Sequence, residues 1–230
     1  MSTAWLTGAT GAWGGAFTRA LLETGYDVLA LGRRDDPDLA VRAGELGRTW
    51  GFVELDLSMP LSFTALRVAI EAAVPELLRG VPDVLILAAV STDGDRAALM
   101  ATDYLAPATI IDGVAQAMQE RRSGRIGVLV PQNARLGLAG LADVAAPQAA
   151  LWTWCEAKRD ELARVGDGVT LTVVIPPRTA SATQRYVARQ SGHSAALHPP
   201  DARGLLRGVL AGRRRVGRRP WLAAMAMLVR

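Results

Sequence analysis

A glycine-rich loop near the amino terminus has the residue types that bind phosphate groups. The segment Thr7-Gly8-Ala9-Thr10-Gly11-Ala12-Trp13-Gly14-Gly15 follows a short apolar run and precedes a helical pattern beginning at Ala16. Gly8 would permit a tight turn, Gly11 would let the backbone approach a pyrophosphate, and Gly14 would allow close packing of the helix on a sheet. The amino end of that helix supplies free N–H groups and a partial positive charge. The loop therefore predicts a dinucleotide site; glycines that serve only a tight turn are the alternative.

Two arginines follow the second apolar run, which ends at Gly32. A site for NAD has a carboxylate near this strand end that binds the ribose hydroxyls, and Gly32 stands at that position. Arg33 and Arg34 carry the charge that suits the additional 2′-phosphate of NADP. Asp35 and Asp36 weaken that positive field, and a solvated turn is the alternative explanation. The pair favours NADP over NAD as the cofactor.

Apolar runs of strand length alternate with helical patterns along the chain. The runs are Thr3 to Leu6, Asp27 to Leu31, Trp50 to Leu55, Val84 to Ala88, Arg125 to Val130 and Thr170 to Ile175. Helical spacing joins Leu66, Ile70, Val74 and Leu77, then Ile110, Ile111, Val114 and Met118, and then the segment Ala149 to Val165. Strand and helix in repeated alternation are typical of a parallel sheet covered on both faces. We therefore predict an α/β fold, a Rossmann-type doubly wound parallel sheet, as a single domain over residues 1–230.

Two segments after the last predicted strand differ from the rest. Residues 177–202 are rich in Ser, Ala, Gly and His without a clear period, and we expect them to cover a site at the carboxyl ends of the strands. Residues 203–230 hold eight arginines and no acid, and we expect a basic helical tail. A solvated helix face explains this tail; an anionic partner or a membrane surface is the alternative.

Charge and composition exclude several classes. Taking the eight tail arginines from the 26 basic residues leaves 18 against 22 acids, so the net charge of +4 does not indicate nucleic-acid binding. Cys155 has no intrachain disulfide partner, and two histidines with one cysteine predict no metal site. No apolar run approaches the roughly 20 residues of a membrane-spanning helix, and the start lacks an export signal. We expect a soluble, cytoplasmic protein.

Several motifs in this order resemble those of the short-chain dehydrogenase/reductase family over nearly the whole chain. The loop resembles the family's glycine motif in its GxxGxxG form, with Ala12 where the commonest form has its middle glycine. Asp56-Leu57 resembles the acidic position that meets the adenine, Ala88-Ala89-Val90 resembles the Asn-Ala-Gly turn, and Pro176 resembles the proline of a Pro-Gly pair. The resemblance implies NADP(H) as cofactor and a homodimer or homotetramer, in which the helix carrying Trp152 and Trp154 packs against its mate.

The catalytic positions depart from the family pattern. Members of the family use a tyrosine as proton donor or acceptor, a lysine four residues later, a serine 13 residues before the tyrosine, and an asparagine on an earlier helix. Here the serine position is Pro131, the tyrosine position Val144, the lysine position Gln148 and the asparagine position Asp103. Pro131 and Val144 cannot donate or accept a side-chain proton, although Gln148 could still bind a ribose. Loss of a positioned acid costs roughly 10²- to 10⁴-fold in rate, so we expect carbonyl reduction to be severely impaired.

Few side chains could substitute for the lost acid. The candidates for contact with a substrate are Asn133 after the serine position, Asp103, Gln148, and Tyr186 and His193 in the predicted covering segment. Asp103 has a plainer explanation as a helix-start or surface carboxylate, and Tyr186 and His193 as parts of an exposed loop. Tyr104 and Asp143 are weaker candidates of the same kind.

Three functions remain open at this stage. The first is an enzyme of small-molecule (secondary) metabolism that binds NADP(H) and an apolar substrate and steers a non-redox step such as cyclisation or isomerisation. The second is an atypical NADPH-dependent reductase of carbonyl or imine substrates that uses a substitute proton donor. The third is a protein that senses NADP and regulates a partner through its arginine tail.

Overall fold

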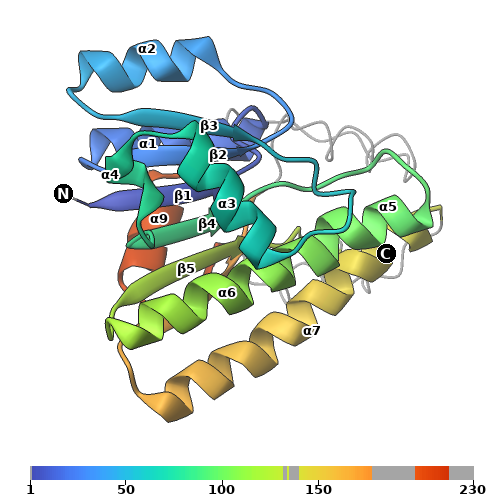
Figure 1. The fold of residues 1–230 in the computed structure, drawn as a ribbon. Coiled ribbons are helices and arrows are strands. Elements are labelled where there is room, and N and C mark those ends of the chain that lie inside the picture. Colours follow the sequence, from blue (N-terminus) through green and yellow to red (C-terminus); the bar gives the residue numbers. More distant parts are fainter. Residues whose placement is uncertain (1, 132–133, 135–139, 178–199, 218–230) are drawn as a thin grey trace.

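Seven parallel strands form one sheet in the computed structural model, which describes residues 2–131, 134, 140–177 and 200–217 (Figure 1). The strand order is β3-β2-β1-β4-β5-β6-β7, and each neighbouring pair runs parallel. The bounds are β1 Thr3–Thr7, β2 Asp27–Gly32, β3 Trp50–Glu54, β4 Val84–Leu87, β5 Gly124–Leu129, β6 Val169–Ile175 and β7 Arg215–Gly217. The predicted Rossmann-type fold is confirmed.

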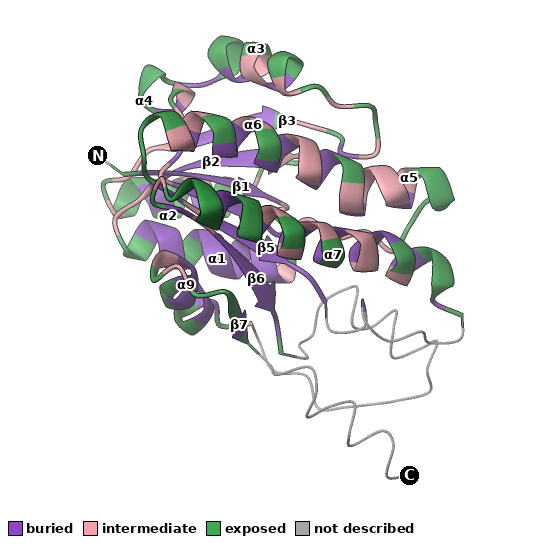
Figure 2. Ribbon diagram, turned by 90° about the horizontal axis from the view of Figure 1, so that it is seen from below, coloured by how far each residue is buried: buried purple, intermediate pink, exposed green. Residues whose placement is uncertain are grey.

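Helices cover both faces of the sheet and divide the core into two layers. The bounds are α1 Ala12–Glu23, α2 Pro37–Glu45, α3 Phe63–Ala73, α4 Glu76–Arg79, α5 Arg96–Met100, α6 Ala106–Glu120, α7 Ala142–Val165 and α9 Arg203–Leu210. Strand residues alternate between the layers: Trp5 packs with α3, α6 and α7, whereas Ala4 and Leu6 pack with α1, α2 and α9. Figure 2 shows the buried strands between helices whose outer faces are exposed. Continuous burial of the strands explains their continuous apolar sequence.

One predicted helix is interrupted by a proline. The pattern that joins Leu66 to Leu77 is split, because α3 ends at Ala73 and α4 begins only at Glu76. Val74 has φ −123° and ψ 158°, the extended conformation that steric clash with Pro75 favours in the preceding residue.

The basic tail is helical only in part. The helix α9 ends before Gly212, which has φ +65°, and the chain then forms β7, where Arg215 pairs in register with Val173 of β6. The prediction of a helix over 203–230 is therefore wrong for the strand residues 215–217, and residues 218–230 lie outside the described residues. Thr172 Oγ donates a hydrogen bond of 2.6 Å to the Arg213 carbonyl and supports the turn into β7.

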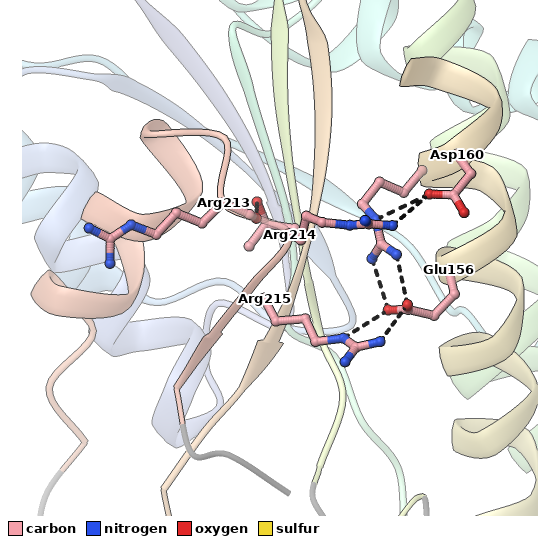
Figure 3. Close-up of polar contacts among 7 residues, drawn as sticks. Glu156, Asp160, Arg213, Arg214 and Arg215 are labelled. Atoms are coloured by element: carbon pink, nitrogen blue, oxygen red, sulfur yellow. Dashed lines mark hydrogen bonds and ion pairs between the residues drawn. The ribbon is translucent and has the colours of Figure 1, made fainter. Parts of the chain in front are cut away.

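Ion pairs fix β7 to α7 (Figure 3). Arg214 pairs with Asp160 at 2.8 Å, and Arg215 pairs with Glu156 at 2.6 Å. Hydrogen bonds from Arg159, with a further contribution from Arg215, lower the pKa of Glu156 to about 2. Arg203 pairs with Glu23 of α1 at 3.0 Å. These arginines are engaged with acids of the same chain, which disfavours their use for an anionic partner.

Candidate functional site

A cavity of about 700 Å³ opens at the carboxyl ends of the strands, between the loops that follow β1 to β6. Among the described residues it brings together almost all of the predicted cofactor positions. These are Gly8, Thr10, Gly11, Ala12, Trp13, Arg33, Arg34, Asp56, Leu57, Ala88, Ala89, Val90 and Pro176. Gly14 lies behind the loop as a packing residue, and Gln148 is buried away from the cavity wall.

The glycine loop has the geometry of an anion site. Gly8 has φ +74°, and a Cβ atom there would lie 2.8 Å from the Ala89 backbone. A Cβ atom on Gly14 would lie 1.8 Å from the Gly8 carbonyl oxygen, so only glycine fits at this helix–loop contact. Gly11 begins α1 without a side-chain cap, and Ala12 and Trp13 line the cavity. The first turn of α1 therefore opens into the cavity with the N–H groups that bind phosphate oxygens.

The two acids that follow the arginine pair are held by other groups. Asp35 Oδ1 accepts hydrogen bonds from Trp50 Nε1 at 3.0 Å and from the Asp36 N–H at 2.8 Å. The Asp36 carboxylate caps α2 by accepting from two backbone N–H groups of its first turn. Arg33 and Arg34 line the cavity. These hydrogen bonds come from neutral groups and leave the charge of both acids in place, so the weakening of the positive field expected from them remains.

Asp56 lines the same cavity as the two arginines. Hydrogen bonds from the backbone N–H and the hydroxyl of Ser58 lower the pKa of its carboxyl group, and the charge of Arg33 lowers it further. An ionised carboxylate at this place suits contact with the amino group of an adenine.

The other half of the cavity is apolar where the family places its catalytic serine and tyrosine. Pro131 lines the cavity at the end of β5, and Val144 is buried in the first turns of α7. Pro131 and Val144 therefore provide no proton donor.

Asp103 and Gln148 form a buried pair beside this apolar wall. Each residue is 2% exposed, and Gln148 Nε2 donates a hydrogen bond of 3.0 Å to Asp103 Oδ2. Asp103 Oδ1 accepts from the Ser91 N–H at 2.8 Å. Burial raises the pKa of Asp103 to about 7, although both hydrogen bonds oppose the shift. The structure thus places Asp103 beneath the cavity wall, whereas its neighbour Thr102 is on the surface of the cavity.

Thr102 and Asp103 lie in a single turn of π-helix, η1 (Ala101–Leu105). Between α5 and α6 the wider turn carries Thr102 to the cavity and Asp103 into the interior. The sequence gives no periodic signal for such a turn, and the sequence analysis did not predict it.

Of the remaining candidates, the two that the structure describes do not line the cavity. Asp143 is exposed and pairs with Arg96 at 2.8 Å, and Tyr104 packs partly buried against the larger core layer. Burial raises the pKa of the Cys155 thiol to about 12, as expected for a small core residue. Three candidates, Asn133, Tyr186 and His193, lie outside the described residues, as does most of the predicted covering segment 177–202.

Five polar residues of the cavity wall were not predicted from the sequence: Ser58, beside Asp56, and four others. Ser91, Thr92 and Asp93 follow the Ala88-Ala89-Val90 turn directly, and Thr102 precedes the recognised asparagine position. Ser91 Oγ donates to the Asp93 carbonyl at 2.9 Å and accepts from the Asp93 N–H at 3.2 Å. For Ser91, Thr92 and Asp93 the available signal was their position shortly after β4, a strand that ends at the predicted site.

Comparison with known proteins establishes the family. Residues 2–192 match the family model described as short chain dehydrogenase, and the chain belongs to this family. No curated protein sequence matches the chain. The described residues also contain no helix with the length and apolar character needed to cross a membrane.

Solved structures share the fold at low sequence identity. A short-chain dehydrogenase from Streptomyces avermitilis has a TM-score of 0.78 at 19% identity over 99% of this chain and 94% of that one. A short-chain dehydrogenase from Sphingobium yanoikuyae, in complex with NADPH, has a TM-score of 0.77 at 17% identity over 94% and 87%. A 3-oxoacyl (acyl-carrier-protein) reductase from Agrobacterium tumefaciens, with NADP bound, has a TM-score of 0.70 at 21% identity over 83% and 75%.

Proposed function

We propose that the chain binds NADP(H) in the cavity and acts on an apolar small molecule of secondary metabolism in a non-redox step, such as cyclisation or isomerisation. The observation that carries the proposal is the contrast within one cavity. The adenosine half has the glycine loop and both arginines, whereas the other half has Pro131 where the family has a serine. Val144, at the position of the tyrosine, is buried in α7 and is not among the residues that line the cavity.

The residues of the adenosine half fit the cofactor. The uncapped first turn of α1 would bind the pyrophosphate, and Arg33 and Arg34 would bind the 2′-phosphate. Asp56 would accept a hydrogen bond from the adenine. Structures of similar fold with bound NADP or NADPH support this choice of cofactor.

The residues of the other half orient a substrate more readily than they protonate it. NADPH, when bound, supplies a hydride donor. Pro131 and Leu129 give the cavity apolar surface, and Thr92 and Thr102, which also line it, carry hydroxyls that could bond a substrate. Holding a flexible molecule in one conformation accelerates an intramolecular reaction without a proton donor.

Titration of the purified protein with NADPH and with NADH tests the first half of the proposal. Trp13 lines the cavity, so excitation of tryptophan should give sensitised NADPH emission, and Trp13→Phe should reduce this emission.

Incubation with NADPH and a panel of ketones, aldehydes and cyclic imines tests the proposed non-redox step. Oxidation of NADPH at ordinary enzymic rates would overturn the non-redox step.

An atypical NADPH-dependent reductase is the second candidate. It is favoured by the Asp93 carboxylate and the Thr102 hydroxyl, which line the cavity and could pass a proton to or from a substrate. Imine substrates suit such a site because they need a hydride more than an acid. Loss of NADPH oxidation in Asp93→Asn or Thr102→Val, with cofactor binding retained, would identify this function.

A regulatory NADP-sensing protein is the third candidate, and the structure favours it least. Three of the tail arginines that it would use are paired with Glu23, Asp160 and Glu156. Cofactor binding without turnover, together with partner capture that depends on residues 203–230, would support it.

We also propose that the protein is cytoplasmic and forms a homodimer or homotetramer. Sedimentation analysis of the purified protein would test the oligomeric state.

A further inference from the structure

We propose that Asp103 positions the loop of residues 91–94 in the cavity wall and couples this loop to a proton. The loop is held in place while the Asp103 carboxyl group is ionised, and it is released when that group is protonated. The effect of this coupling on a bound nucleotide rests on the proposed binding of NADP(H) in the cavity, whereas the coupling itself concerns the chain alone.

A series of hydrogen bonds connects Asp103 with the loop. Asp103 Oδ1 accepts from the Ser91 N–H at 2.8 Å. Ser91 Oγ in turn accepts from the Asp93 N–H at 3.2 Å and donates to the Asp93 carbonyl at 2.9 Å. Ser91, Thr92, Asp93 and Gly94 all line the cavity. A carboxyl group in the interior is therefore joined directly to a polar part of the cavity wall.

The described neighbours of the Asp103 carboxyl group are neutral. Asp103 is 2% exposed, and its two oxygens accept from the Ser91 N–H and from Gln148 Nε2. Burial raises the pKa of Asp103 to about 7, although both hydrogen bonds oppose the shift. A change of charge near neutral pH therefore takes place in the interior, next to the cavity.

The charged side chains on the loop and on the helices packed against η1 are held elsewhere or lie at the cavity. They include Asp93 and Asp95 of the loop, Arg96 of α5, Asp112 of α6, and Asp143 and Lys158 of α7. Asp95 caps α5, Arg96 pairs with Asp143, and Asp112 pairs with Lys158. None of these charges contributes to the shift in the pKa of Asp103.

Protonation of Asp103 should weaken its bond to the loop. An ionised carboxylate accepts hydrogen bonds about twice as strongly as a neutral acceptor. The protonated group also carries an O–H donor, in a place where the Ser91 N–H and Gln148 Nε2 already donate. The loop yields more easily than α7, because Asp93 and Gly94 are exposed whereas Gln148 is buried.

A nucleotide in the cavity would respond to the same proton. Residues 91–94 line the cavity together with the glycine loop and Val90. A nucleotide in contact with the held loop would bind the chain more tightly when Asp103 is ionised. Because linkage is reciprocal, the bound nucleotide would also lower the pKa of Asp103. Nucleotide affinity should therefore rise as the pH passes through about 7.

The amide resonances of the loop test the coupling in the chain without nucleotide. As the pH rises from about 6 to about 8, the Ser91 N–H proton should move to lower field with a midpoint of about 7, and the Asp93 N–H should shift with the same midpoint. Asp103→Asn keeps an oxygen that can accept from the Ser91 N–H and should abolish both titrations, whereas the control Asp143→Asn should retain them. No titration in the unmodified chain, or the same titration in Asp103→Asn, would overturn the proposal.

Ser91→Ala tests the path from Asp103 to Asp93, and it serves as the test if Asp103→Asn does not fold. The change keeps the backbone N–H that binds Asp103 and removes the hydroxyl that binds Asp93. The N–H at position 91 should titrate as before, whereas the Asp93 N–H should lose its titration. An unchanged response of the Asp93 N–H would contradict transmission through the hydroxyl.

Calorimetric titration with NADP+, which unlike NADPH is stable in mild acid, tests the effect on a nucleotide. Between about pH 6 and about pH 8, the affinity of the unmodified chain should increase about fivefold more than that of Asp103→Asn, the difference between a charged and a neutral hydrogen bond. The phosphate of the nucleotide titrates in both proteins and cancels from the comparison. An equal pH dependence would overturn the coupling to nucleotide. If NADP+ does not bind the unmodified chain at either pH, the proposed function fails, while the amide titration still decides the coupling of Asp103 to the loop.

Discussion

The two halves of the cavity use different parts of the chain. In the adenosine half the essential groups are backbone N–H groups and glycines, and a Cβ atom on Gly14 would collide with the Gly8 carbonyl. In the other half the family's chemistry depends on a few side chains, and Pro131 and Val144 replace two of them without disturbing the strands or helices that carry them. A cofactor site built from backbone is therefore tied to the fold, whereas a catalytic site built from side chains can change while the fold remains.

The largest effect is expected from Gly14→Val. The new side chain would overlap the Gly8 carbonyl, which a Cβ atom alone would approach to 1.8 Å, so we expect NADPH binding to be lost and the free energy of unfolding to fall by about 3 kcal/mol or more. Chemical denaturation and NADPH titration measure the two effects. Gly44→Ala in α2 is the control, because a Cβ atom there meets nothing within 4 Å, and it should raise stability by about 0.5–1 kcal/mol. If Gly14→Val and Gly44→Ala have the same effect on stability and on NADPH binding, the backbone of the glycine loop is not essential to the adenosine half, and the contrast between the two halves fails.

The next effect concerns Asp103 and pH. The pKa of this carboxyl is about 7 in the folded chain against 3.8 as its ordinary value, so the folded state binds more protons between these pH values. The contribution of this carboxyl to stability should therefore be fully present below about pH 4 and be lost, by on the order of 3 kcal/mol, as the pH rises to about 7. Asp103→Asn should remove this part of the decline, as unfolding measured across that range would show.

The control for this change is Asp143→Asn, which alters an exposed carboxylate. It should leave the pH dependence of unfolding almost unchanged. A decline of the same size in the unmodified chain and in Asp103→Asn would show that the buried pair is not its cause.

A smaller effect, confined to the adenosine half, is expected from Arg33→Ala and Arg34→Ala. Each should weaken NADPH binding by about tenfold, the value of one charge-assisted hydrogen bond, and leave NADH binding unchanged. Titration with both nucleotides gives the ratio. Arg42→Ala removes an arginine that pairs with Glu45 on exposed α2, and it should change neither affinity. Equal weakening of both nucleotides would argue against recognition of the 2′-phosphate.

The smallest effect is expected outside both halves, at the ion pairs between β7 and α7. Arg214→Gln should lower the free energy of unfolding by less than about 1 kcal/mol, because Arg214 and Asp160 are both largely exposed. Added salt should reduce the difference from the unmodified chain. NADPH affinity should stay the same, and a clear loss of affinity would show that β7 supports the cavity.

The sequence predicted the sheet well because its strands are buried on both faces and therefore read as apolar runs. It missed β7, a strand of three residues that includes only one buried apolar side chain, Val216. It also extended one helix through Val74, where the steric effect of Pro75 outweighs the apolar spacing. The spacing of apolar residues does not predict a very short strand, which forms by pairing with its neighbour in the sheet, or a helix end that is set by a following proline.

The adenosine half could be predicted because its motif is contiguous in sequence. The Asp103–Gln148 bond joins residues 45 positions apart, and alignment with the family placed both near the site without indicating that they bond each other. The π-helical turn that separates Thr102 from Asp103 is a three-dimensional feature with no sequence period. Thr92, Asp93 and Thr102 lie between the positions of the family motifs, so the motifs did not indicate that they line the cavity.

Cys155 gives the chain an experimental advantage. It is the single cysteine, it is buried in α7, and its pKa of about 12 keeps the thiol protonated and unreactive at ordinary pH. A cysteine introduced on an exposed helix would therefore react alone with a fluorescent or spin label, without prior removal of the native thiol. Labels placed in this way on α2 and α5 would report the distance across the cavity mouth before and after nucleotide is added.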